Sequence, residues 1–103
     1  MKLVRLALAP TLLMLMPALA HAADPNTGRE LAQRWCASCH AVAPGQTRAS
    51  ADVPPFAEIA ARPNFNANTL AFFLLEPHPK MPNMSLTRVE AGDIAAYIGT
   101  LRK

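Results

Sequence analysis

Cys36-Ala37-Ser38-Cys39-His40 is the stretch of this sequence that carries most information about its fold. It has the pattern C-x-x-C-H, which is typical of the attachment of a c-type haem. Two thiols at this spacing can form thioethers with the two vinyl groups of one porphyrin, and the histidine beside them can bind the iron as an axial ligand. The pattern predicts one covalent haem c, attached at Cys36 and Cys39 and ligated by His40.

Other interpretations of the two cysteines have less support. A zinc site needs four ligands, and beyond the motif only His21 and His78 supply further donors of the usual kind. A thioredoxin-like redox pair requires a βαβ setting, of which the sequence shows no sign. A simple disulfide or a chance match is the remaining alternative, but haem attachment is favoured in a short chain without other cysteines.

Residues 1–22 have the composition of a secretory signal peptide. Two basic residues precede an apolar run over residues 6–15, and small residues follow, ending in an A-x-A pattern. This run is shorter than the roughly 20 residues that span a membrane as a helix. We expect cleavage after Ala22, with the position after Ala20 as the alternative, and a periplasmic domain over residues 23–103. An uncleaved membrane anchor is the other interpretation.

Removal of the signal peptide makes the chain nearly neutral. The whole chain has a formal charge of +3, and loss of Lys2 and Arg5 leaves eight basic against seven acidic residues. No basic stripe remains, which argues against nucleic-acid binding. The remaining residues form one small domain that buries little apolar surface by itself, so a covalently held porphyrin would supply a large part of its core.

Apolar periodicity and turn residues predict helices separated by proline-rich loops. The first helix starts near Asn26 or Thr27 and runs into the haem motif, and a short second helix begins around Pro55. Asn68 can cap a third helix over residues 69–76. This segment is apolar almost all round, which predicts deep burial, with a short β-strand as the alternative. The buried side of the first helix is expected to hold Gly28, Leu31, Ala32, Trp35, Cys36 and Cys39.

The last helix has the clearest start. Thr87 and Glu90 have the spacing of a capping box. An apolar stripe at helical spacing then predicts packing against the core by Ala91, Ile94, Ala95, Ile98 and Leu101. The residues that lie off this stripe are Arg88, Asp93, Thr100 and Arg102.

The loop of residues 76–87 offers candidates for the second axial ligand of the iron. Met81 and Met84 are the only methionines after residue 22, and three prolines restrict the backbone of this loop. A methionine ligand raises the reduction potential and suits an electron carrier. Met81 ranks first and Met84 second, although packing against the haem edge is favoured for Met84. His78 would instead give a bis-histidine haem of lower potential.

Together these features resemble a class I, mono-haem cytochrome c of the small bacterial type. The resemblance extends over nearly the whole chain after residue 22, and its haem motif is highly specific. It implies an all-α small cytochrome c fold, with three to four helices wrapped around one covalent haem and crossing N- and C-terminal helices. The matching segments beside the haem motif are Gly28-x3-Ala32-x3-Cys36, Pro54-Pro55-Phe56, Lys80-Met81-Pro82, Leu86-Thr87 and Asp93-Ile94-Ala95-Ala96-Tyr97.

The resemblance also implies roles for single residues. Thioether attachment falls to Cys36 and Cys39, and axial ligation to His40 and Met81. In the family, a proline carbonyl accepts the second imidazole N–H of the histidine; Pro54 matches this position, with Pro44 as the alternative. Gly28 would let the terminal helices cross closely, near Ile94 and Tyr97.

With both axial positions filled by protein, a substrate has no direct route to the iron. We therefore expect a one-electron carrier rather than an enzyme, with Phe56, Phe72 and Phe73 keeping the haem pocket dry. Its expected partners are redox proteins (a quinol-oxidising complex, oxidase, reductase or dehydrogenase), and it is expected to be monomeric with at most peripheral membrane contact. The alternatives are a dedicated haem c subunit of one periplasmic oxidoreductase complex, and a ligand sensor or peroxidase-like protein whose distal bond opens.

Overall fold

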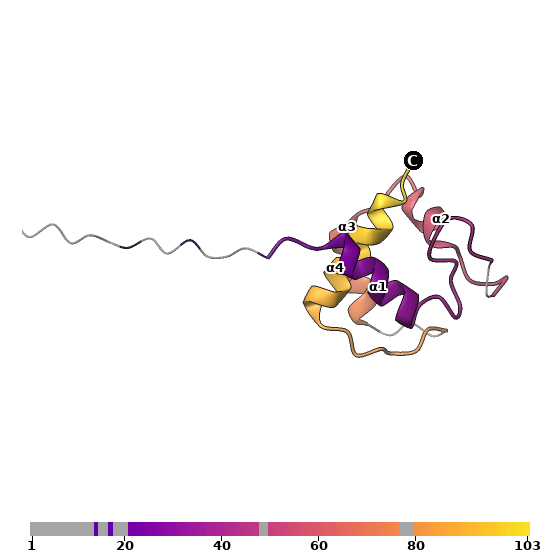
Figure 1. Cartoon of the computed structure of the whole chain (residues 1–103), viewed down its shortest axis with the longest axis horizontal. Helices are drawn as coiled ribbons and strands as arrows, with labels where there is room; N and C mark the ends of the chain where they lie inside the picture. Colours follow the sequence, from indigo (N-terminus) through magenta and orange to yellow (C-terminus); the bar gives the residue numbers. More distant parts are fainter. Residues whose placement is uncertain (1–13, 15–16, 18–20, 48–49, 77–79) are drawn as a thin grey trace, which may run out of the picture.

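The computed structural model describes residues 14, 17, 21–47, 50–76 and 80–103. Within these segments the regular structure is helical, without strands. The four helices are α1 (Pro25–Trp35), α2 (Phe56–Ala60), α3 (Ala67–Leu75) and α4 (Arg88–Thr100). All three other helices contact α4, and α1 crosses it (Figure 1). This is the small all-α fold with crossing terminal helices that the sequence predicted.

The crossing of α1 and α4 depends on a glycine. A Cβ atom placed on Gly28 would lie 1.9 Å from the carbonyl oxygen of Asp93 and 2.9 Å from the backbone nitrogen of Ile94. Only a residue without a side chain allows the two backbones to approach this closely. The expected close crossing at Gly28, near Ile94, is confirmed.

α1 begins slightly earlier than predicted because Asp24 caps it. The Asp24 carboxylate accepts hydrogen bonds from the Asn26 backbone N–H at 2.9 Å and from the Thr27 hydroxyl at 2.8 Å. Pro25 then occupies the first turn, where its missing N–H costs no hydrogen bond. The helix ends at Trp35, directly before the C-x-x-C-H motif.

The capping box predicted for α4 is confirmed. The Glu90 backbone N–H donates to the Thr87 hydroxyl oxygen at 3.1 Å, and the Thr87 N–H donates to the Glu90 carboxylate at 2.9 Å. The hydrogen bonds that Thr87 gives to the Glu90 carboxylate, first that of its backbone N–H, stabilise the charged form and lower the pKa of Glu90. The start of α4 is therefore fixed by two reciprocal hydrogen bonds.

The prediction for α3 was wrong in its start and in its burial. Asn66 rather than Asn68 caps the helix, since the Asn66 side chain accepts from the Thr69 N–H at 2.9 Å. None of its residues is buried, and Phe72 is 68% exposed. The helix contacts the core through two half-buried leucines, Leu70 and Leu74. The apolar residues on every side of this short helix therefore did not mean that every side is buried.

The core lies mainly between α1 and α4. The predicted stripe of α4 is buried, except that Leu101 is only half-buried, and Asp93 is buried although it lies off this stripe. On α1, Trp35 and Cys39 were expected on the buried side, but Trp35 is 47% exposed, and Cys39 lies beyond the end of the helix and is exposed. The buried cluster consists of Leu31, Ala32, Cys36, Val42, Phe56, Ala60, Ile94, Tyr97 and Ile98. No helix in the described segments has the length and hydropathy that a membrane span requires.

Candidate haem site

The C-x-x-C-H motif folds into a tight turn at the end of α1. The carbonyl oxygen of Cys36 accepts hydrogen bonds from the backbone N–H groups of Cys39 at 3.1 Å and His40 at 2.8 Å. The turn brings both cysteines and the histidine to the wall of one cavity. The three residues that the sequence predicted as attachment sites and ligand are therefore adjacent in space.

This cavity has a volume of about 670 Å³, within the range of sites that hold small molecules and cofactors. Residues from α1, α2, α3 and α4 and from the loops between them line it, and most of them are apolar. Phe56 and Phe73 contribute to the lining as predicted, whereas Phe72 does not. The other apolar lining residues include Trp35, Ile59, Phe65, Leu70, Leu74 and Ile98.

The imidazole of His40 is oriented by a backbone carbonyl. Its Nδ1 atom lies 2.7 Å from the carbonyl oxygen of Pro54, and the ring lies against Phe56 with centroids 5.1 Å apart. A carbonyl oxygen only accepts hydrogen bonds, so Nδ1 carries the proton and Nε2 has a free lone pair. The expected contact with Pro54 is confirmed, while Pro44 is exposed. A histidine held in this tautomer is prepared to bind a metal ion through Nε2.

Gln46 supports the motif from outside the cavity, and the sequence analysis missed it. Its side-chain oxygen accepts from the Val42 N–H at 3.0 Å, and its Nε2 donates to the carbonyl oxygens of His40 at 3.1 Å and Ala37 at 3.3 Å. These three bonds connect the residues before and after the second cysteine. A single glutamine in a loop has no spacing or periodicity that would have indicated this role.

The two cysteine thiols are free and differ in exposure: Cys36 is buried and Cys39 is exposed. Burial raises the pKa of the Cys36 thiol to about 11, so this sulfur is protonated at neutral pH. The exposed Cys39 is open to reagents and partners from solvent. Both cysteines line the cavity, as thioether attachment to one porphyrin requires.

Met81 and Met84 are both half-buried and both line the cavity. The loop that carries them bends at Ser85, which has a positive φ of 53°. The Asn83 side chain stabilises this bend by accepting from the Ser85 N–H at 2.8 Å. The third candidate ligand, His78, lies outside the described residues.

The donor set of the cavity fits a haem. Two thiols, an imidazole with a free ring nitrogen and two thioethers face one apolar space, and the soft sulfur and imidazole donors suit haem iron. His21 belongs to a different, smaller pocket beside α4.

Comparison with known proteins agrees with this description. Residues 23–98 match the family model described as "Cytochrome C oxidase, cbb3-type, subunit III". The chain is also 68% identical over 83 residues to "Cytochrome c-552" of Bradyrhizobium diazoefficiens, an alignment that covers 81% of this chain and 80% of that protein. No solved structure matches the chain. The chain therefore belongs to the cytochrome c family, whose members bind haem c covalently and transfer electrons.

Proposed function

We propose that this protein is an exported one-electron carrier with His40 and Met81 as the axial ligands of its haem, attached through Cys36 and Cys39. The hydrogen bond between His40 Nδ1 and the Pro54 carbonyl oxygen carries most of this proposal, because it leaves Nε2 free to bind iron. When bound, the haem supplies the Fe(II)/Fe(III) couple. The apolar lining excludes water from the cavity and so favours the less charged, reduced iron.

Met81 is proposed over Met84 because it lies between Lys80 and Pro82 in the loop that resembles the family's ligand loop. Pro82 fixes one backbone dihedral next to it, which limits the entropy lost when a weak ligand binds. We therefore assign packing at the haem edge to Met84.

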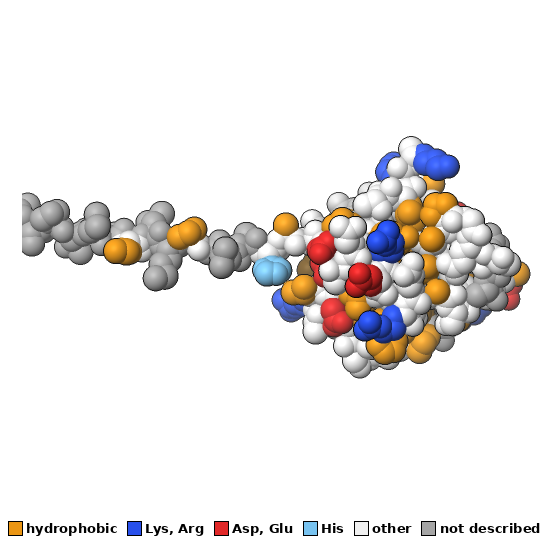
Figure 2. Space-filling view, in the orientation of Figure 1, with side chains coloured by type: hydrophobic (Ala, Val, Ile, Leu, Met, Phe, Trp, Pro, Cys, Tyr) orange, Lys and Arg blue, Asp and Glu red, His pale blue; other side chains and the backbone are white. Residues whose placement is uncertain are grey.

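We propose further that residues 1–22 are a cleaved signal peptide and that the domain works in the periplasm. The order of charged, apolar and small residues supports this proposal, and so does the family match, which begins at Ala23. Its partners would be other redox proteins. Acidic and basic side chains are interspersed on the face of α1 (Figure 2), which fits transient docking rather than binding to a polyanion.

A second candidate function is a permanent haem subunit of one oxidoreductase. The description of the matching family, which names an oxidase subunit, favours it. Purification of the protein from its native membranes and periplasm distinguishes the two. A monomeric haem protein supports the free carrier, whereas stoichiometric association with one enzyme supports the subunit.

Substitution of each methionine tests the ligand assignment. We expect Met81→Ala to abolish the sulfur-to-iron charge-transfer band at the red end of the oxidised spectrum and to lower the reduction potential, because a soft ligand of reduced iron is lost. Met84→Ala is the matched control, since it removes the other thioether of the same loop, and it should retain the band. Loss of the band in Met84→Ala alone would reverse the assignment.

A further inference from the structure

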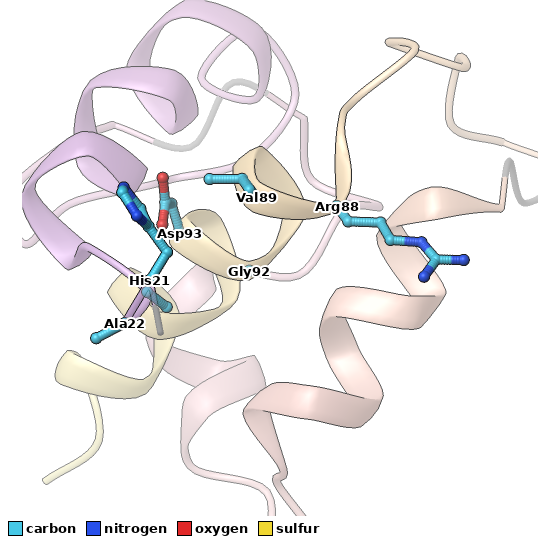
Figure 3. A pocket seen from close by; sticks show the side chains of 7 residues that line it. His21, Ala22, Arg88, Val89, Gly92 and Asp93 are labelled. Atoms are coloured by element: carbon cyan, nitrogen blue, oxygen red, sulfur yellow. The ribbon is translucent and has the colours of Figure 1, made fainter. Parts of the chain in front are cut away.

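Asp93 is a buried carboxylate at the crossing of α1 and α4. It is only 5% exposed, and its Oδ1 accepts a hydrogen bond from the Asp24 backbone N–H at 2.8 Å. In the described segments no lysine, arginine or histidine forms an ion pair with it. Arg88 lines the same pocket, but its guanidinium points away from Asp93 (Figure 3). A buried carboxylate with a single neutral donor leaves room for a cationic partner.

The next backbone nitrogen toward the N-terminus belongs to Ala23. Covalent geometry places it within about 3.7 Å of the Asp24 nitrogen, and hence within about 6.5 Å of Asp93 Oδ1. Ala23 and Asp93 line one pocket of about 210 Å³, together with His21, Ala22 and residues of the first turns of α4. In the uncut chain the Ala23 nitrogen is a neutral amide.

We propose that Asp93 is the binding site for the primary ammonium group that forms when the chain is cut between Ala22 and Ala23. This inference rests on the proposed cleavage site. The peptidase hydrolyses the amide bond: water gives its hydroxyl to the Ala22 carbonyl carbon and a hydrogen to the Ala23 nitrogen. At neutral pH Ala22 then ends in a carboxylate and Ala23 in an ammonium.

The cut also clears the pocket. His21 and Ala22 leave with the signal peptide, and the remaining lining beside Ala23 is formed by α4. A cation replaces a neutral amide within reach of a buried carboxylate, which stabilises both charged groups. Processing would thus add a second link between the start of α1 and α4, beside the hydrogen bond from the Asp24 N–H, after export.

Of the other charged groups around the new amine, some favour its protonated form and others disfavour it. Arg88, in the first turn of α4, lines the same pocket and disfavours a second cation there. The Asp24 carboxylate favours a cation, although it already accepts from Asn26 and Thr27. The first turn of α1 carries no acidic residue, and its free N–H groups disfavour a cation. In the uncut chain Asp93 is the buried one of the two carboxylates, so solvent weakens its attraction for a cation less than that of Asp24.

The pairing predicts how stability depends on pH. An α-amino group has a pKa of about 7.7–8.0 in an unfolded chain, and a carboxylate partner raises this value in the folded protein. The stabilisation is then fully present below about pH 7.7 and is lost as pH rises through the raised, folded value.

The test uses the holoprotein with its N-terminus defined by intact mass. NMR titration of isotope-labelled Ala23 should give an α-amine pKa at least about one unit above the unfolded value, a tenfold change in the protonation constant. Asp93→Asn should return it toward the unfolded value. The same result is expected for a protein with one extra glycine before Ala23, which moves the amine while leaving Asp93 in place.

Equal amine pKa values in the wild-type and glycine-extended proteins overturn the proposal, as does a natural N-terminus at any residue other than Ala23. If Asp93→Asn does not fold, the glycine-extended protein decides the question. The optical spectrum and the covalent haem mass of the same samples report on the electron-carrier function separately, so failure of one proposal is distinguished from failure of the other.

Discussion

At the scale of single residues, Gln46 shows how a haem motif depends on a side chain outside it. Gln46→Met keeps the length of the side chain but removes the hydrogen bonds to Val42, Ala37 and His40. Three backbone groups then lose their partner, so we expect the free energy of unfolding to fall by about 2 kcal/mol. Denaturant unfolding of the holoprotein measures this loss.

The matched control for this substitution is Gln33→Met on the exposed side of α1. It should change the stability by less than about 0.5 kcal/mol. Gln46→Glu is a further comparison, because it keeps the acceptor for the Val42 N–H and loses both donor bonds. A stability loss in Gln46→Met no larger than in the control would show that Gln46 does not support the motif.

Sequence patterns identified the residues whose role depends on neighbours in the chain. The spacing of Cys36, Cys39 and His40 is local, and so is the capping box of Thr87 and Glu90, which the structure reproduces. Gln46 and Asp93 could not be found in this way, because their partners are backbone groups brought near only by the fold. A sequence does not show which backbone groups from other parts of the chain the fold will bring beside a given side chain.

At the scale of the helices, the contact between α1 and α4 is the element on which the fold depends. In Gly28→Ala the added Cβ would lie 1.9 Å from the Asp93 carbonyl oxygen, so the two helices must move apart. We expect the holoprotein to lose about 3 kcal/mol of stability or more, since core packing around the crossing is disrupted. Thermal unfolding followed by circular dichroism measures this change.

α4 offers a matched control for this prediction. A Cβ atom on Gly92 would meet no atom within 4 Å, and Gly92 lies inside the helix. Gly92→Ala should therefore stabilise the protein by about 0.5–1 kcal/mol. If both substitutions had effects of the same sign and size, the close approach at Gly28 would not be the cause.

α3 shows the limit of pattern reasoning at this scale. Its run of apolar residues has no polar face, so periodicity could not show which side would contact the core. The structure turns Leu70, Phe73 and Leu74 toward the haem cavity and leaves Phe72 exposed. Which side of such a helix faces inward depends on the cofactor and on the neighbouring helix, and neither can be inferred from the helix alone.

At the scale of the whole molecule, the haem cavity is large for so small a domain. It is partly open to solvent, so without the haem its apolar walls would be in contact with water, and each Å² of apolar surface exposed in this way costs about 25 cal/mol. The total stability of a small domain is only about 5–15 kcal/mol. Burial of these apolar walls by the haem is therefore expected to contribute much of the stability, and the haem is as much a part of the core as it is a redox group.

Residues 23–103 produced without haem maturation should therefore lack a fixed tertiary structure. We expect little near-ultraviolet circular dichroism and reduced helicity, because removal of the haem leaves apolar surfaces from all four helices in contact with water. The haem-loaded protein of identical sequence is the control and should unfold in one cooperative transition. A haem-free chain with native helicity and an equally sharp transition would show that the contacts of α1 and α3 with α4 suffice, and that the haem contributes its chemistry without being needed for folding.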